Sequence, residues 1–315
     1  MLGSGRYTLD NLIDAARNPK IFLGEFHRLG FEVNRSIHRR MGDSKGDPVT
    51  EEDWDVLHIL DACRLDMFRD QNTIDGELES RYSLGSESWE FLNKNFAGDT
   101  FHDTVYVTAN PHAPSLPEDT FHATINLLES DWDTVLQTVH PEDVTKAALK
   151  ANKKFPDKRL IIHFMQPHYP FIGEFGQQLD HKGYDNPNDE SKDDSTPREV
   201  WGSLGHGRIS KDDVWRAYRE NLDVVLPHVQ QLVDEITGKA VVTADHGNLV
   251  GERTSPLPVR GYGHPRGAIA PELREVPWLI VEDGARRTIS NDPPVETDRM
   301  QDDLVEDRLA ALGYR

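Results

Sequence analysis

The chain has 315 residues, of which 37% are hydrophobic and 8% aromatic, so it is long enough for one large α/β domain or two smaller ones. Its 55 acidic residues outnumber its 35 Lys and Arg residues, which gives a formal net charge of -20 at pH 7. This charge argues against general affinity for nucleic acid or for an anionic membrane surface, because both are polyanions.

The choice of basic residues is uneven, with 12 Lys against 23 Arg. A surface rich in carboxylates and poor in Lys suits a salt-filled cytoplasm, where dense counterions screen the repulsion between like charges. We therefore expect a halophilic protein, with an ordinary acidic enzyme as the alternative.

No apolar run approaches the roughly 20 residues of a membrane span, and the start of the sequence lacks the basic-then-apolar pattern of a signal peptide. We expect a cytoplasmic location. The single cysteine, Cys63, excludes an intramolecular disulfide.

The first part of the sequence predicts helices that precede the main domain. Helical patterns cover residues 8–17 and 19–40, and the stretch from Gly42 to Pro48 then indicates a break. We interpret residues 1–50 as an N-terminal helical extension and residues 51–315 as the main domain.

Short apolar strand patterns alternate with helical patterns over the rest of the chain. Strands are predicted at 55–60, 104–108, 160–165, 240–244 and 276–281. Helices are predicted after Ser88 and at 141–154, 211–237 and 296–312. Residues 179–200 are dominated by Asp, Asn, Ser, Lys and Pro, so we expect a solvated insertion loop there.

This alternation predicts an α/β fold with a mainly parallel central sheet and helices on both faces. In such sheets ligands bind outside the carboxyl ends of the strands, and polar side chains follow several of the predicted strands. Asp61 follows the first strand, and Asp245 and His246 follow the fourth.

These three residues offer the oxygen and imidazole donors that a divalent ion such as Mn or Zn takes. An unpaired carboxylate at the tip of a buried strand is costly, so a cation, a helix cap or water must accompany it. Asp61 as the N-cap of a following helix is the alternative, and an Asp-His-Gly triplet also occurs by chance. We predict that Asp61, Asp245 and His246 converge on one ion.

Several segments resemble the sulfatase-like hydrolases of the alkaline phosphatase superfamily. Leu-Asp-Ala-Cys-Arg-Leu-Asp at 60–66 and Val-Val-Thr-Ala-Asp-His-Gly at 241–247 look like the two metal-binding segments of that group. Further similar segments lie at 164–170, 263–265, 276–280 and 308–314. The resemblance covers residues 52 to 315 and implies that 51–315 is a catalytic domain with a bound divalent metal, a side-chain nucleophile and in-line transfer of a phosphoryl or sulfuryl group.

The resemblance leaves the nucleophile to be found. Sulfatases make theirs from a Cys or Ser in a Cys-x-Pro-x-Arg pattern, but Leu65 and Met67 hold the Pro and Arg positions after Cys63, so formylglycine chemistry is not expected. A Ser just before a helix, whose N-terminus can receive an anion, fits instead. We favour Ser86, with Ser88 as the competitor, although Ser88 also suits an N-cap.

Three further residues are candidates by the same resemblance. His168 and His264 would bind the ester's non-bridging oxygens, protonate the leaving group or hold a second metal. Each could instead be a simple loop residue beside a proline. Arg64 is a candidate clamp for the phosphate or sulfate group, with an ion pair to Asp66 as the alternative.

The sequence therefore predicts a metal-dependent hydrolase or transferase of phosphate or sulfate esters that acts through a Ser nucleophile. The expected cofactor is one or two divalent ions of Mn, Zn, Ca or Mg, and the expected substrate is a small-molecule or glycan ester. The alternative is a non-catalytic protein that keeps the fold and binds metal or anions. Transfer of phosphoglycerol or phosphoethanolamine is disfavoured, because relatives that do so usually carry membrane spans.

Overall fold

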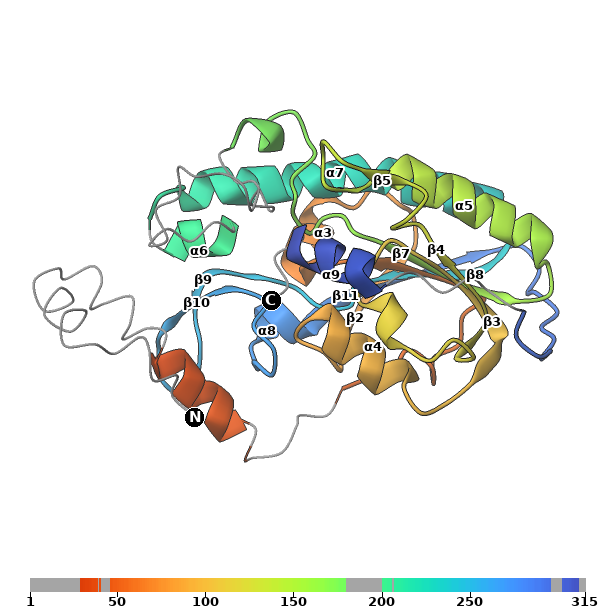
Figure 1. The fold of residues 1–315 in the computed structure, drawn as a ribbon, viewed down its shortest axis with the longest axis horizontal. Helices are drawn as coiled ribbons and strands as arrows, with labels where there is room; N and C mark the ends of the chain where they lie inside the picture. Colours follow the sequence, from red (N-terminus) through yellow and green to blue (C-terminus); the bar gives the residue numbers. More distant parts are fainter. Residues whose placement is uncertain are drawn as a thin grey trace, which may run out of the picture.

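The computed structural model describes residues 29–38, 40, 46–179, 200–205, 207–295 and 302–311. Its centre is a seven-stranded sheet in the order β2-β11-β8-β1-β7-β3-β4 (Figure 1). These strands are β1 (Val56–Leu60), β2 (Glu77–Tyr82), β3 (Phe101–Thr108), β4 (Phe121–Asn126), β7 (Arg159–Phe164), β8 (Gly238–Thr243) and β11 (Glu275–Asp283). The run β8-β1-β7-β3-β4 is parallel throughout, and β11 is antiparallel to both β8 and β2. The expected mainly parallel α/β fold is confirmed.

Helices lie on both faces of this sheet, as Figure 1 shows. Besides the helical residues 29–38, the described α-helices are α3 (Leu65–Gln71), α4 (Ser88–Phe96), α5 (Pro141–Lys154), α6 (Val200–Gly205), α7 (Lys211–Glu235), α8 (Pro271–Arg274) and α9 (Asp302–Ala311). Two short hairpins complete the fold, β5 (Trp132–Asp133) with β6 (Thr138–Val139), and β9 (Leu249–Arg253) with β10 (Arg260–Gly263). Among the described helices, none is long and apolar enough to cross a membrane.

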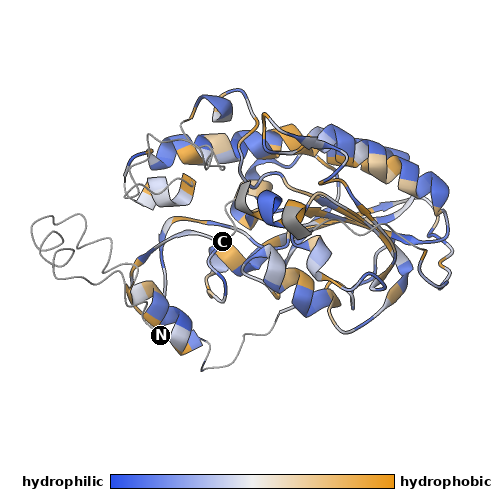
Figure 2. Cartoon of the chain, viewed as in Figure 1, coloured by the Kyte–Doolittle hydropathy of each residue, from blue (hydrophilic) through white to orange (hydrophobic). Residues whose placement is uncertain are grey.

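Successive residues of a strand point to opposite faces, and this alternation divides the core into two. Val56 and Leu60 of β1 pack with α3, α5 and α7 in the larger cluster. Leu57 and Ile59 pack on the other face with Phe91 and Phe96 of α4. Hydrophobic colour is accordingly concentrated on the strands between the helices in Figure 2. The face that α4 covers is called the α4 face below.

Several predicted boundaries differ from the structure. The strand expected at 104–108 begins earlier, at Phe101, and the tail helix expected at 296–312 is described over Asp302–Ala311. Strands β2 and β4 were not predicted. The β2 sequence, ELESRY, lacks a clean apolar alternation, whereas FHATIN of β4 alternates apolar and polar residues and was overlooked. The helix at 8–17 and nearly all of the insertion at 179–200 fall outside the described residues.

The helical residues 29–38 pack on the β9–β10 hairpin rather than on the central sheet. The Asn34 side chain donates to Thr254 Oγ1 at 3.0 Å and to the Leu257 carbonyl at 2.8 Å, and its oxygen accepts from the Leu257 amide at 2.8 Å. Phe31 adds an apolar contact to the cluster around Leu249. The division into an extension at 1–50 and a domain at 51–315 stays a prediction.

Candidate metal centre and active site

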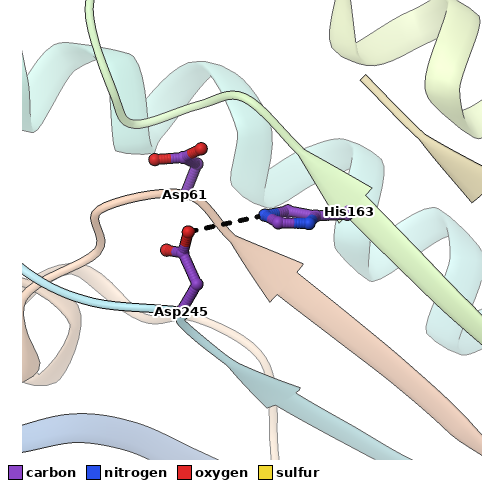
Figure 3. A group of neighbouring side chains, drawn as sticks. All are labelled: Asp61, His163 and Asp245. Carbon is purple, nitrogen blue, oxygen red and sulfur yellow. Dashed lines mark ion pairs between the residues drawn. The ribbon is translucent and has the colours of Figure 1, made fainter. Parts of the chain in front are cut away.

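Two carboxylates and one imidazole meet at one place because successive side chains of a strand point to opposite faces of the sheet. Asp61 continues β1 in phase with Leu57 and Ile59, so it points to the α4 face. Asp245 follows β8 in phase with Val241, and His163 lies within β7 in phase with Ile161, on the same face. Since β1, β7 and β8 are parallel neighbours, their carboxyl ends bring the three side chains together (Figure 3).

These side chains form a buried group with the spacing of a metal site. One ligand atom from each of Asp61, His163 and Asp245 lies within 4.8 Å of the others, and all three residues are fully buried. His163 Nε2 is 3.7 Å from Asp245 Oδ2, the pair drawn with a dashed line in Figure 3. Within the described residues, neither Asp61 Oδ1 nor His163 Nε2 has a hydrogen-bond partner, which is costly for buried polar atoms. A divalent cation fits this donor set because it would satisfy the Asp61 oxygen.

His246, the imidazole that the sequence singled out, also lies at this point. Its Nε2 is 3.6 Å from both Asp61 Oδ1 and Asp245 Oδ2. Its Nδ1 lies 2.8 Å from the Gly247 carbonyl, which can only accept, so Nδ1 carries a proton, and in the neutral ring Nε2 presents its lone pair to the carboxylates. Gly247 is needed here because a Cβ would lie 2.2 Å from the Glu272 carbonyl oxygen. The predicted trio is therefore adjacent, and metal binding by it stays a prediction.

His163 was not among the residues predicted from the sequence. Its hydrogen bonds indicate a different role from that of His246. Tyr106 Oη accepts from Thr108 Oγ1 at 3.2 Å and lies 2.8 Å from His163 Nδ1. A tyrosine that accepts from Thr108 can donate its own proton to Nδ1, which leaves the single ring proton of a neutral His163 on Nε2, facing Asp245. A histidine inside an otherwise apolar strand was the available signal.

The two carboxylates oppose each other electrostatically. Burial raises the pKa of Asp61 well above its ordinary value, and the charge of Asp245 raises it further. Burial acts on Asp245 in the same direction, but the imidazoles of His246 and His163 outweigh it and lower the pKa of that carboxyl. The buried pair thus carries one negative charge easily, and a second negative charge requires a cation beside it.

Ser88 places a hydroxyl directly on the carboxylate pair. Its Oγ lies 2.7 Å from Asp245 Oδ2, 3.2 Å from Asp61 Oδ2 and 3.4 Å from His246 Nε2. Ser88 is the first residue of α4, and the N-cap is Glu87, whose carboxylate accepts from the Trp89 and Glu90 amides. The alternative of Ser88 as the N-cap is therefore excluded, and its hydroxyl is directed at the carboxylates from the helix N-terminus.

Ser86, the serine favoured from the sequence, points elsewhere. Its Oγ donates to Glu90 Oε2 at 2.7 Å and lies 3.2 Å from the Pro265 carbonyl. The two serines are only two residues apart, but Ser86 precedes the N-cap Glu87 and Ser88 is the first helical residue, and their side chains contact different partners. The geometry thus reverses the order of preference, and Ser88 becomes the first candidate nucleophile.

Asn110 is a further site residue that the sequence analysis missed. It follows β3, is fully buried, and its Nδ2 donates to Asp61 Oδ2 at 2.8 Å. Its Oδ1 accepts from the His112 amide at 2.8 Å, which fixes the orientation of the side-chain amide. An amide donor in this place can hold a substrate oxygen as well as the carboxylate. It was missed because nothing in the sequence sets this Asn apart from other loop residues.

The predicted His168 and His264 lie beside His246. The His264 ring centroid is 4.8 Å from that of His246 and 4.9 Å from that of His168. His264 Nδ1 lies 2.8 Å from Asn248 Oδ1, and His168 Nδ1 contacts the Tyr169 carbonyl. Burial, reinforced by His246, lowers the pKa of His168 to about 3 and that of His264 well below its ordinary value. Both imidazoles are therefore neutral near pH 7 and can act as hydrogen-bonding groups or ligands.

Arg64 and Cys63 do not contribute to the group. The Arg64 guanidinium is held by Asp66 at 2.6 Å and 2.9 Å, by Glu252 Oε1 at 2.9 Å and by the Asn248 carbonyl at 2.9 Å. The structure therefore favours the ion pair with Asp66 over the clamp role. Burial raises the pKa of the Cys63 thiol well above its ordinary value, so it stays protonated and packs in the core.

Comparison of the sequence with protein-family models and with curated proteins gives no match. Solved structures give matches, each distant in sequence. One is the integral membrane lipooligosaccharide phosphoethanolamine transferase A of Neisseria meningitidis, at 11% identity and a TM-score of 0.42. The match covers 71% of this chain and 47% of that one, so the chain spans about half the length of that protein.

Two further matches have a similar level of likeness. The C-terminal periplasmic domain of EcEptC from Escherichia coli, solved as a zinc complex, matches at 14% identity over 76% of each chain, with a TM-score of 0.44. An alkaline phosphatase superfamily protein of Vibrio parahaemolyticus matches at 13% identity over 85% of this chain and 69% of that one, with a TM-score of 0.38.

Proposed function

We propose that this chain is a metal-dependent hydrolase or transferase of phosphate or sulfate esters with Ser88 as its nucleophile. The observation that carries the proposal is the position of Ser88 Oγ, 2.7 Å from Asp245 and 3.2 Å from Asp61 at the N-terminus of α4. A serine hydroxyl is a weak nucleophile near neutral pH and needs such activating neighbours. The nine-residue helix behind Ser88 directs its N-terminal partial positive charge toward an anionic ester group.

Asp61, Asp245 and His246 would hold the divalent ion, and His163 would orient Asp245. The lone pair of His246 Nε2 and the Asp61 oxygen that lacks a hydrogen-bond partner among the described residues support this assignment. A bound divalent ion would supply positive charge that activates the serine oxygen and balances charge on the transferred group. The donor set of two carboxylates and one imidazole suits Zn or Mn better than Ca, which prefers six or more oxygen ligands.

The reaction that these residues support has two halves. In the first, Ser88 Oγ bonds to phosphorus or sulfur, the ester bond to the alcohol breaks, and the serine proton passes by way of the neighbouring carboxylate to the departing oxygen. In the second, the oxygen of water or of an acceptor alcohol displaces Ser88, and the proton of that water or alcohol returns to the serine. Asn110 would donate to an oxygen of the transferred group, and His168 and His264 would contact the organic part or the leaving oxygen; the position of Asn110 beside Asp61 and of the two imidazoles beside each other supports these roles.

The charges around the site favour a transferred group with a single negative charge. Arg64 is neutralised by Asp66 and Glu252, and Arg266 donates to Glu87 at 2.8 Å. His168 and His264 are neutral, because their pKa values are lowered. A divalent ion against two carboxylates then leaves little surplus positive charge for a dianionic phosphate monoester. We therefore expect phosphodiesters or sulfate monoesters to be the preferred substrates.

The test uses protein purified without chelator, supplied with Mn or Zn, and three nitrophenyl esters: a phosphodiester, a phosphate monoester and a sulfate. We expect turnover of the diester or the sulfate at least about tenfold above the monoester, as a difference of about 1.4 kcal/mol in transition-state binding would give. Ser88→Ala should lower kcat by several orders of magnitude without loss of the bound metal.

Ser86→Ala and Cys63→Ala are the matched controls, because each alters a buried side chain next to the same segments. Both should keep far more activity than Ser88→Ala. Loss of turnover in Ser86→Ala with survival in Ser88→Ala would return the nucleophile role to Ser86. A wild-type protein that binds metal and turns over none of the three esters would instead support the non-catalytic metal- or anion-binding alternative.

A further inference from the structure

The loop that carries His264 is attached to the first turn of the helix that carries Ser88. This loop, residues 264–267, is the first part of the connection from β10 to α8 and is called the His264 loop. It is bounded by Gly263, with φ of 70°, and ends at Gly267, with φ of 71°. Both glycines adopt a left-handed conformation that other residues rarely take, so the loop's path depends on them.

Glu90 is the centre of this attachment. Its Oε2 accepts from Ser86 Oγ at 2.7 Å, from the Ser86 amide at 3.1 Å and from the Gly267 amide at 3.2 Å. Ser86 Oγ lies 3.2 Å from the Pro265 carbonyl, so the serine contacts the loop as well as the carboxylate. One carboxylate therefore joins the segment before α4, the helix itself and the His264 loop. The side chain of Glu90 is only 11% exposed, which shelters these bonds from water.

A second attachment runs through the neighbouring residues of α4. Arg266 Nε donates to Glu87 Oε1 at 2.8 Å, and the Arg266 guanidinium lies 4.3 Å from the centre of the Trp89 ring. Arg266 is half exposed, so this pair is screened by solvent and contributes less than the buried bonds of Glu90. The stronger hold on the loop is thus the Glu90 carboxylate.

The attachment fixes His264 relative to the nucleophile. The His264 ring packs on His246, whose Nε2 is 3.4 Å from Ser88 Oγ. His264 Nδ1 also lies 2.8 Å from Asn248 Oδ1, so the imidazole is held by its side-chain contacts and by the path of the loop that carries it. A displacement of about 1 Å in such a group can cost about 100-fold in rate.

We propose that Glu90 is a positioning residue that, with Ser86, holds the His264 loop against α4 and so aligns His264 with Ser88. The inference rests on the proposed function in naming His264 and Ser88 as reacting groups. It also gives Ser86 a role that does not require it to be the nucleophile. Of the three bonds to this oxygen, the one from the Gly267 amide holds the loop directly, and the two from Ser86 fix the serine that contacts Pro265. Removing the carboxylate is therefore expected to loosen the loop at Gly267 while leaving the sheet and the Asp61–Asp245 pair intact.

The test compares Glu90→Ala with Glu90→Gln, which keeps an acceptor oxygen at the same reach. In Glu90→Ala we expect hydrogen exchange at the Gly267 amide to rise at least about tenfold, because its acceptor is gone. The kcat for the best nitrophenyl ester should fall by about 10- to 100-fold with the bound metal retained. Glu90→Gln should restore most of the protection and most of the rate.

Glu142→Ala is the matched control, since Glu142 is an exposed glutamate in the first turn of α5, away from the site. It should change neither Gly267 exchange nor kcat. Unchanged Gly267 exchange in Glu90→Ala would overturn the proposal, as would faster exchange with an unchanged kcat. If the wild-type protein turns over no ester, the proposed function fails, and exchange at Gly267 still decides whether Glu90 holds the loop.

Discussion

Substituting Asp61 by Asn tests the central electrostatic feature of the site, two carboxylates that share one buried point. The change removes one negative charge and keeps the shape of the side chain. The oxygen of the introduced amide, in the place of Oδ2, can still accept from Asn110 Nδ2 at 2.8 Å and from Ser88 Oγ at 3.2 Å. The amide nitrogen takes the place of Oδ1, an atom without a hydrogen-bond partner in the described part of the chain. Few interactions other than the charge are therefore altered.

The expected magnitude follows from the spacing of the group. Its ligand atoms lie within 4.8 Å of one another, and two full charges at that distance repel by about 3 kcal/mol at an effective dielectric constant of about 20. The pKa of Asp61 is raised in the folded state, so the folded protein binds a proton that the unfolded chain has released. This group therefore costs the metal-free protein stability as pH rises from its unfolded pKa of about 4 toward its folded pKa.

The assay is denaturant or thermal unfolding of wild type and Asp61→Asn, each with a chelator and with saturating Zn or Mn. With chelator at pH 8, Asp61→Asn should be the more stable protein by up to about 3 kcal/mol, and its advantage should shrink at pH 5. With metal at about 100 times its Kd, the wild type should gain about 2.7 kcal/mol and the variant little. The reasoning is refuted if the metal-free variant is no more stable than the wild type, or if metal stabilises both proteins equally.

Two further predictions concern stability. His58 in β1 is fully buried, neither ring nitrogen has a hydrogen-bond partner among the described residues, and burial lowers its pKa to about 3. In the unfolded chain His58 takes up a proton below its ordinary pKa of about 6.5, and this destabilises the folded state by about 2 kcal/mol at pH 5. His58→Leu should therefore raise Tm more at pH 5 than at pH 7.5. Equal shifts of Tm at both pH values would contradict this. If the net charge of -20 is a halophilic adaptation, Tm should rise steeply between low and molar KCl, and a flat Tm would favour an ordinary acidic enzyme.

Much of the fold and the centre of the site could be predicted from the sequence, because their signals are local. A run of apolar residues followed closely by a carboxylate identifies a buried strand and marks its carboxyl end. This is why Asp61 and the Asp245–His246 pair were found at adjacent strand ends. The edge strand β2 escaped because a half-exposed strand with charged residues carries no alternation to detect, whereas the alternation of β4 was present in the sequence and was overlooked.

The remaining site residues depend on which segments meet in space. His163 and Asn110 join the group only through the pairing of β7 with β1 and with β3, a register that no single segment encodes. The choice between Ser86 and Ser88 depended on Glu87, whose carboxylate capped α4 and left Ser88 directed at Asp245. The sequence by itself thus determined the buried strands and the polar residues that follow them. Tertiary structure decided which hydroxyl and which imidazole face the carboxylates, because that depends on how distant segments cross.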